Sequence, residues 1–213
     1  MEPRRDCSTK SLIIFNLRNL DHEAYTQLMF TARKIAQMSA FFAEKQGGTI
    51  KILKLMKLLY LSDRESITRY GVPISFDYAY SMHQGPMLSQ ALDFVDGFIQ
   101  DASDRAKWDE WIGSRDNHRV SLNRKFVHDD LDELSDANLD VLATVWKQFG
   151  HFDEWQLVKY THENCPEHKE TPKGQRNPLS DSEILAAVGH DKQVDELSAD
   201  IQAQRRLDAI FSH

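Results

Sequence analysis

The sequence predicts a mainly α-helical protein, a single helical domain of about seven or eight helices around a central helix at residues 49–70. Apolar residues recur with the period of a helix over most of the chain, and residues that favour helix N-termini precede several of these segments. Only two segments, 74–82 and 118–127, alternate apolar and polar residues as β-strands do. They predict a small two-stranded β element beside the helices.

The composition indicates a folded protein that buries a core without disulfide bonds. The 213 residues are 41% hydrophobic and 28% charged, which is ordinary for a globular protein. The net charge of −7 argues against nucleic-acid binding, because phosphate groups are bound by clustered Lys and Arg. Two cysteines, Cys7 and Cys165, are too few for a disulfide framework and fit a reducing compartment. The apolar runs are too short for a signal peptide or a membrane span, so we expect a cytoplasmic protein with no membrane partner.

The N-terminal part of the chain predicts a tail and then a first helix. Residues 1–22 are polar and charged around a short apolar run, and we expect a loosely held tail there. Apolar residues then recur at helical spacing over 23–46. The glycine pair Gly47-Gly48 ends this helix.

The segment 49–70 predicts the central helix, because apolar side chains cover most of its circumference. Thr49 is the expected N-cap, and Gly71 is the expected left-handed residue after the last turn. Asp63 falls in the middle of the main apolar face. Three lysines lie opposite that face and indicate a solvated surface rather than a nucleic-acid site, namely Lys51, Lys54 and Lys57.

The next stretch changes from helical to strand periodicity and back. The alternating segments 74–82 and 118–127 are expected to pair with each other. Between them, Pro86 stands where the first residue of a helix would, and an apolar stripe of helical period follows at 88–99. Ser103 is a candidate N-cap for a short helix that carries two tryptophans.

Capping residues place the next two helices. Ser135 is the expected N-cap of a helix with a regular apolar stripe. Asp153 and Gln156 have the spacing of a capping box, in which each side chain bonds to the other residue's backbone N–H. In the helix that this box begins, Trp155 and His162 share one face.

The C-terminal part predicts a loop and two further helices. Residues 164–179 hold three prolines among polar residues, which favours a loop or linker. Ser180 and Glu183 form a second capping box, for a helix at 181–188. A last helix is expected at 192–211.

The groups that could carry chemistry favour structural roles. Asp63 lies on an apolar face, where a carboxylate has a shifted pKa and sometimes a catalytic task, but buried carboxylates are usually satisfied by backbone amides. His162, Cys165 and His168 offer zinc-ligand atoms, yet a closed zinc site needs four ligands. His83 has no partner pattern for acid–base catalysis, and nucleophile and phosphate-loop motifs are missing from the sequence. We therefore expect no enzyme activity, no cofactor and no bound metal.

Several segments in this order resemble the Panacea domain, the SocA-like antitoxin family. The matching segments are LMKLLYLSDR at 55–64, RYGVPI at 69–74, Asp77, SMHQGP at 81–86, and WQLVKYTH at 155–162 followed by Cys165-Pro166. The resemblance covers about residues 25–170. It divides the chain into a tail at 1–22, a Panacea-like domain at 23–170, and a helical segment at 171–213 that is expected to pack on the same domain.

The resemblance implies an antitoxin, of bacterial or phage origin, that neutralises a cognate toxin encoded by an adjacent gene through direct binding. The alternatives are a proteolytic adaptor that delivers the toxin to a AAA+ protease, and a metal-dependent or acid–base enzyme built on Asp63, Asp77, His83 or the His162 group. DNA binding is disfavoured, because the sequence lacks a basic recognition helix. The family positions carried over, most of them with structural roles, are Tyr60, Asp63, Arg64, Asp77, Gly85, Pro86 and His162. The partner-binding surface is not identified by the sequence.

Overall fold

The computed structural model describes residues 30–211, so the predicted tail at 1–22 and the start of the predicted first helix lie outside the described residues. The mainly α-helical fold is confirmed. In the described part the α-helices are α2 (Ala32–Lys45), α3 (Ile52–Tyr70), α4 (Ser89–Asp96), α5 (Ala102–Asp109), α6 (Asp136–Phe149), α7 (Glu154–Asn164), α8 (Asp181–Ala187) and α9 (Val194–Phe211). The strands are β1 (Thr49–Lys51), β2 (Ala79–Met82), β3 (Gly85–Leu88), β4 (Arg119–Ser121) and β5 (Asn177–Leu179).

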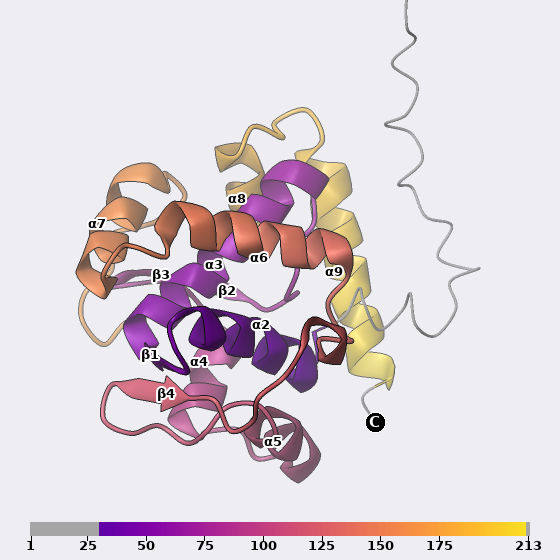
Figure 1. Ribbon diagram of the computed structural model, residues 1–213. Helices are drawn as coiled ribbons and strands as arrows, with labels where there is room; N and C mark the ends of the chain where they lie inside the picture. The colour runs from indigo at the N-terminus through magenta and orange to yellow at the C-terminus, as the bar shows by residue number, and fades with distance from the viewer. Residues whose placement is uncertain (1–29, 212–213) are drawn as a thin grey trace, which may run out of the picture.

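Helix α3 lies in the middle of the molecule and packs against α2, α6, α7, α8 and both sheets (Figure 1). In this view α6 crosses in front of α3, while α7 lies on the left and α9 on the right. Because neighbours surround α3, its leucines Leu55, Leu58 and Leu59 are all fully buried. The central position predicted for this helix is therefore correct.

The start of the central helix differs from the prediction. Residues 49–51 form β1, because their backbone pairs with β4 in an antiparallel ladder. The N–H of Ile52 donates to the carbonyl of His118 at 2.9 Å, which extends the pairing to the first helical residue. Thr49 is consequently no N-cap. Gly71 ends the helix in the left-handed conformation, with φ of 77°, as predicted.

The predicted pairing of 74–82 with 118–127 is wrong. Strand β2 pairs with β3 in a hairpin and with β5 on its other edge, whereas β4 pairs with β1. The predicted loop at 164–179 therefore ends in a strand. Periodicity reveals that a segment is a strand, but the partner is selected by which segments the fold brings together.

The segment after the hairpin also begins its helix later than predicted. Pro86 lies in β3, and α4 begins at Ser89. Since β3 is an edge strand of the order β3-β2-β5, the missing N–H of a proline is tolerated there. Asp101, two residues before the predicted Ser103, caps α5 by accepting a hydrogen bond from the N–H of Asp104.

The capping predictions for the later helices are confirmed. Ser135 accepts a hydrogen bond from the third residue of α6. Capping boxes begin α7 at Asp153 and α8 at Ser180. These motifs act within one turn, so the sequence alone locates them.

The predicted solvated lysine face of the central helix is wrong for two of its three lysines. Lys57 is 0% exposed and Lys54 is 7% exposed, because helices and the β2–β3 hairpin cover this side of α3 as well. Lys57 donates to the carbonyl of Pro86 at 2.8 Å, and Lys54 donates to the carbonyl of Gly150 at 2.7 Å. Each ammonium group thus binds a backbone carbonyl of a segment outside α3.

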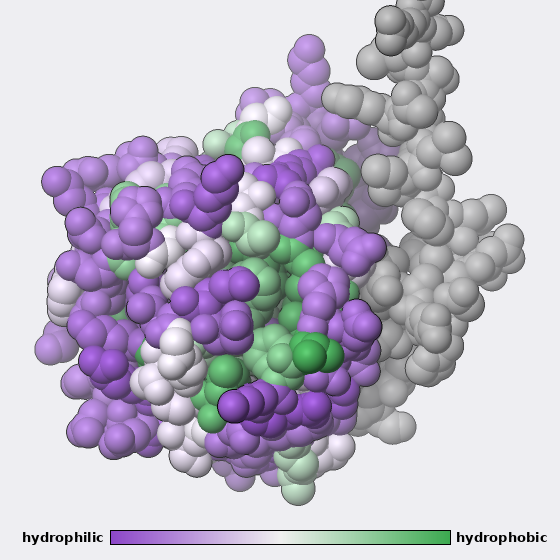
Figure 2. Space-filling view, viewed as in Figure 1, coloured by the Kyte–Doolittle hydropathy of each residue, from purple (hydrophilic) through white to green (hydrophobic). Residues whose placement is uncertain are grey.

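The surface is mostly polar in the view of Figure 2, with hydrophobic residues gathered in the middle of this face, between α6 and α2. Polar residues surround this region. None of the helices within residues 30–211 combines the length and the apolar character that crossing a lipid bilayer requires.

Candidate functional site

The carboxylate of Asp63 holds the chain that follows α3. It accepts hydrogen bonds from the N–H of Ile74 at 3.0 Å and of Ser75 at 2.9 Å, and from the hydroxyl of Ser75. Burial raises the pKa of Asp63 to about 6, and these hydrogen bonds oppose the shift. The structure thus gives Asp63 the backbone-satisfying contacts that the sequence predicted.

Asp77 acts as a remote cap for α4. Its carboxylate accepts hydrogen bonds from the N–H groups of Gln90 at 3.0 Å and Ala91 at 2.9 Å, in the first turn of the helix, and from Tyr78 at 2.6 Å. The residue at the N-cap itself, Leu88, makes no side-chain cap. Burial raises the pKa of Asp77 to about 7. The contacts satisfy free N–H groups at the helix start, which is a structural role.

Tyr60 and Arg64 connect α3 to the segment after α7. The hydroxyl of Tyr60 donates to the carboxylate of Glu167 at 2.5 Å, and Nε of Arg64 donates to the same oxygen at 2.7 Å. The side chain of Glu167 is fully buried. Burial raises the pKa of the nearby Cys165 thiol to about 12, so this group stays protonated and is a poor nucleophile.

Gly85 and Pro86 lie where α3 and α7 meet the hairpin. Gly85 has φ of 93°, and a Cβ at this position would lie 2.7 Å from Oγ1 of Thr161 and 2.8 Å from Nζ of Lys57. Only glycine combines this conformation with so close an approach. Burial lowers the pKa of Lys57 to about 7. Of the seven family positions, the six described so far thus hold elements together; their assignment as family motif residues stays a prediction.

His162, the seventh position, lies at the surface near His168 and Glu170. One ligand atom of each of these three residues lies within 4.8 Å of the other two. The sequence pointed to Cys165 as a third member of this group, but that side chain is buried in the core. His83 is not a member of this group, but it lines a surface hollow that His162 also lines.

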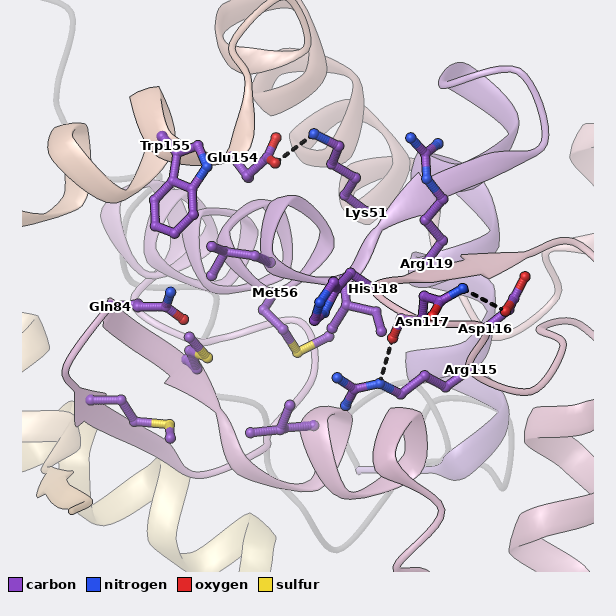
Figure 3. Close-up of a pocket in the computed structure, with 15 residues that line it drawn as sticks. Lys51, Met56, Gln84, Arg115, Asp116, Asn117, His118, Arg119, Glu154 and Trp155 are labelled. Atoms are coloured by element: carbon purple, nitrogen blue, oxygen red, sulfur yellow. Dashed lines mark hydrogen bonds and ion pairs between the residues drawn. The ribbon is translucent and has the colours of Figure 1, made fainter. Parts of the chain in front are cut away.

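A groove of about 870 Å³ lies beside α3, between the β2–β3 hairpin, the start of α7 and the segment 115–119 (Figure 3). Met56 from α3 and Met82 and Met87 from the hairpin line it, and Trp155 of α7 lies at its edge. We call this hollow the methionine groove. The sequence did not reveal it, because its walls come from four separate segments and only their contact makes a cavity.

The rim of the methionine groove is charged and polar. Lys51 and Glu154 form an ion pair with 2.5 Å between Nζ and Oε1, and Nε of Arg115 donates to the carbonyl of Asn117 at 2.8 Å (Figure 3). An apolar lining inside a polar rim is the arrangement of protein-binding surfaces.

A second hollow of about 510 Å³ continues the methionine groove toward His162. The two hollows share Met82, Gln84, Met87 and Trp155. The Trp155 side chain is 59% exposed between them. The two hollows therefore form one continuous depression.

Comparison with known proteins assigns the family. No curated protein and no solved structure matches this chain. The family described as antitoxin SocA-like, Panacea domain, matches residues 55–167, which is more than half of the 213-residue chain. The resemblance found in the sequence is thus confirmed. The matched region runs from α3 to the segment after α7 and includes the three methionines and Trp155 of the groove. The chain belongs to the SocA-like antitoxin family and carries its Panacea domain.

Proposed function

We propose that this protein is an antitoxin that neutralises a cognate toxin, encoded by an adjacent gene, by binding it in the methionine groove. The observation that carries the proposal is the exposed Trp155 beside a methionine-lined hollow inside the family-matched region. Family membership supports the antitoxin role. The apolar side chains that line the groove support this surface as the place where the toxin binds.

The side chains of the groove suit a polypeptide partner. Methionine is flexible and polarisable, so Met56, Met82 and Met87 adapt their shape to an inserted apolar side chain. Tryptophan is enriched among the few residues that supply most of the binding energy at protein interfaces. Trp155 is already exposed, so it can contact a partner without a rearrangement of the fold.

The buried carboxylates favour binding over catalysis. Asp63 and Asp77 make their hydrogen bonds to backbone N–H groups and to Ser75, and they are nearly inaccessible to solvent. A general acid or base must reach the proton that it transfers. We therefore assign these groups to the scaffold and propose a non-enzymatic protein.

The test is neutralisation by the variant Trp155→Ala, with Phe98→Ala as the matched control. Phe98 follows α4, is 64% exposed and lines neither hollow. With the adjacent gene product co-expressed, we expect Trp155→Ala to lose protection of growth. For the purified pair, we expect Trp155→Ala to lose about 2 kcal/mol of binding free energy. This loss makes the Kd at least roughly 30-fold larger.

Phe98→Ala should protect growth and bind like the parent protein. Both side chains are exposed, so the two variants should unfold within about 0.5 kcal/mol of the parent. Protection by Trp155→Ala equal to that by Phe98→Ala would exclude the methionine groove as the toxin-binding site. A harmless adjacent gene product would exclude the antitoxin role itself. The lifetime of the toxin in cells that lack AAA+ proteases separates direct neutralisation, where it is unchanged, from delivery to a protease.

A further inference from the structure

We propose that His162, His168 and Glu170 form a binding site for a divalent transition-metal ion, with Zn²⁺ as the preferred ion. One ligand atom from each residue lies within 4.8 Å of the other two. Nδ1 of His162 lies 3.3 Å from Oε1 of Glu170, and the two imidazole rings meet edge to face with centroids 4.5 Å apart. None of the three residues lines the methionine groove itself, although His162 lines the second hollow that continues it.

The unused nitrogen atoms of the two histidines point to a ligand. Within the described part of the chain, Nε2 of His162 and Nε2 of His168 are both buried and lack a hydrogen-bond partner. Buried polar atoms in proteins are nearly always paired, so two such atoms in adjacent rings require an explanation. A shared metal ion satisfies both nitrogens together.

The partner of the other ring nitrogen of His168 matches that of a metal-binding histidine. A metal-binding histidine usually donates its second ring N–H to an oxygen, which fixes the orientation of the ring. Nδ1 of His168 lies 3.2 Å from Oγ of Ser81, which is such an oxygen. Ser81 is itself held in β2, so the His168 ring is oriented by the hairpin.

The ligand set suits zinc with an open coordination position. Zinc binds imidazole nitrogen and carboxylate oxygen at about 2.0–2.2 Å, and two ligand atoms on a tetrahedral ion lie about 3.4 Å apart. The ligand atoms lie within 4.8 Å of one another, and the Glu170 side chain is 85% exposed and can rotate toward an ion. Two histidines and one carboxylate leave a fourth position for water.

The site would join the last turn of α7 to the segment that follows the turn at residues 166–167. His162 belongs to the last turn of α7, whereas His168 and Glu170 belong to the segment that brings Glu167 under α3. A metal ion bridging them would hold this segment against α7. We therefore expect metal binding to raise the stability of the fold.

The experiment uses the full-length chain purified without a histidine tag, stripped of metal with a chelator and titrated with ZnCl₂ by calorimetry. We expect one Zn²⁺ per chain. At a free Zn²⁺ concentration of 100 times Kd, the unfolding midpoint should rise by roughly 5–10 °C. His168→Gln and Glu170→Gln should each weaken the affinity by at least about 10–100-fold.

Glu163→Gln is the matched control, because Glu163 follows His162 on the same helix and has an exposed side chain outside the cluster. It should bind Zn²⁺ like the parent protein. Glu170 is an exposed residue, so Glu170→Gln keeps the fold and isolates the effect on binding. Sub-stoichiometric binding by the parent protein, or equal affinities for Glu170→Gln and Glu163→Gln, would overturn the proposed site.

Discussion

Asp63 and Asp77 show, at the scale of single residues, how buried charge is used to position backbone. Asp63 binds two consecutive N–H groups after α3, and Asp77 binds two consecutive N–H groups at the start of α4. Burial disfavours the charged form of each carboxylate, so the pKa rises although hydrogen bonds favour ionisation. Both groups therefore make the stability of the protein depend on pH.

The contribution of Asp63 to stability should fall as the pH rises from about 4 to 7. The pKa of Asp63 is about 6 in the folded protein against an ordinary value of 3.8, so the folded state holds the proton more tightly than the unfolded state does. This contribution is fully present below the ordinary pKa and is lost as the pH passes through the folded-state pKa. Asn at position 63 keeps an acceptor oxygen and carries no charge. The stability of Asp63→Asn relative to the parent should therefore improve by on the order of 3 kcal/mol between pH 4 and pH 7.

Urea denaturation at both pH values measures this change. Asp129→Asn is the control, because the Asp129 side chain is almost fully exposed and folding leaves it in water. A relative stability of Asp63→Asn that is the same at pH 4 and pH 7 would contradict the role given to burial.

The β2–β3 hairpin joins several separate parts of the molecule around the methionine groove. It contributes Met82 and Met87 to the groove, and its edge contacts α3 and α7. The close approach depends on Gly85, whose missing side chain leaves room for Thr161 and Lys57. Packing at this single position thus fixes one wall of the groove.

Gly85→Ala should destabilise the protein by roughly 2–4 kcal/mol, because the added methyl group meets two side chains and the backbone has a positive φ. Gly47→Ala is the control for backbone strain alone. Gly47 has φ of 88°, and a Cβ there would meet nothing within 4 Å. We expect it to cost only about 1 kcal/mol in urea denaturation. Equal losses for the two variants would show that the close contact at Gly85 has no energetic consequence.

At the scale of the whole molecule, the C-terminal helix α9 is tied to the family-matched region by Arg205. The guanidinium group donates to the carbonyls of Phe76 and Asp77, each at 2.9 Å, and to both carboxylate oxygens of Asp181. Phe76 is a buried residue with φ of 55°, a conformation that costs energy outside glycine. Arg205 therefore supports a strained segment next to Asp77.

Arg205→Met should destabilise the whole protein by roughly 3–5 kcal/mol, because it leaves the largely buried Asp181 without its cation. The four tryptophans precede residue 171, so their fluorescence reports the predicted 23–170 unit, whereas circular dichroism reports every helix. If 171–213 packs on the same domain, both signals should shift together in a single transition. A fluorescence transition that stays unchanged in Arg205→Met would show that the C-terminal segment folds independently of the rest. The division of the chain at residue 171 stays a prediction, which this experiment tests.

The sequence by itself determined several features that act within one or two helical turns. The apolar period located the central helix, Ser135, Asp153 and Ser180 located helix starts, and the burial of Asp63 followed from its place on the apolar face. The family resemblance rested on the same local segments. Each of these signals is complete within a short stretch of chain, which is why the structure agrees with them.

Only the tertiary structure decided the features that need two distant segments to meet. Residues 49–51, predicted as helix, form a strand because they pair with β4. Lys54 and Lys57 are buried because other elements enclose α3. The methionine groove and the histidine cluster likewise arise where separate elements come into contact. Periodicity records which side of a segment is apolar; it does not record what packs against the other side. That is the physical reason why the sequence indicated the class of the protein while the candidate binding surfaces required the fold.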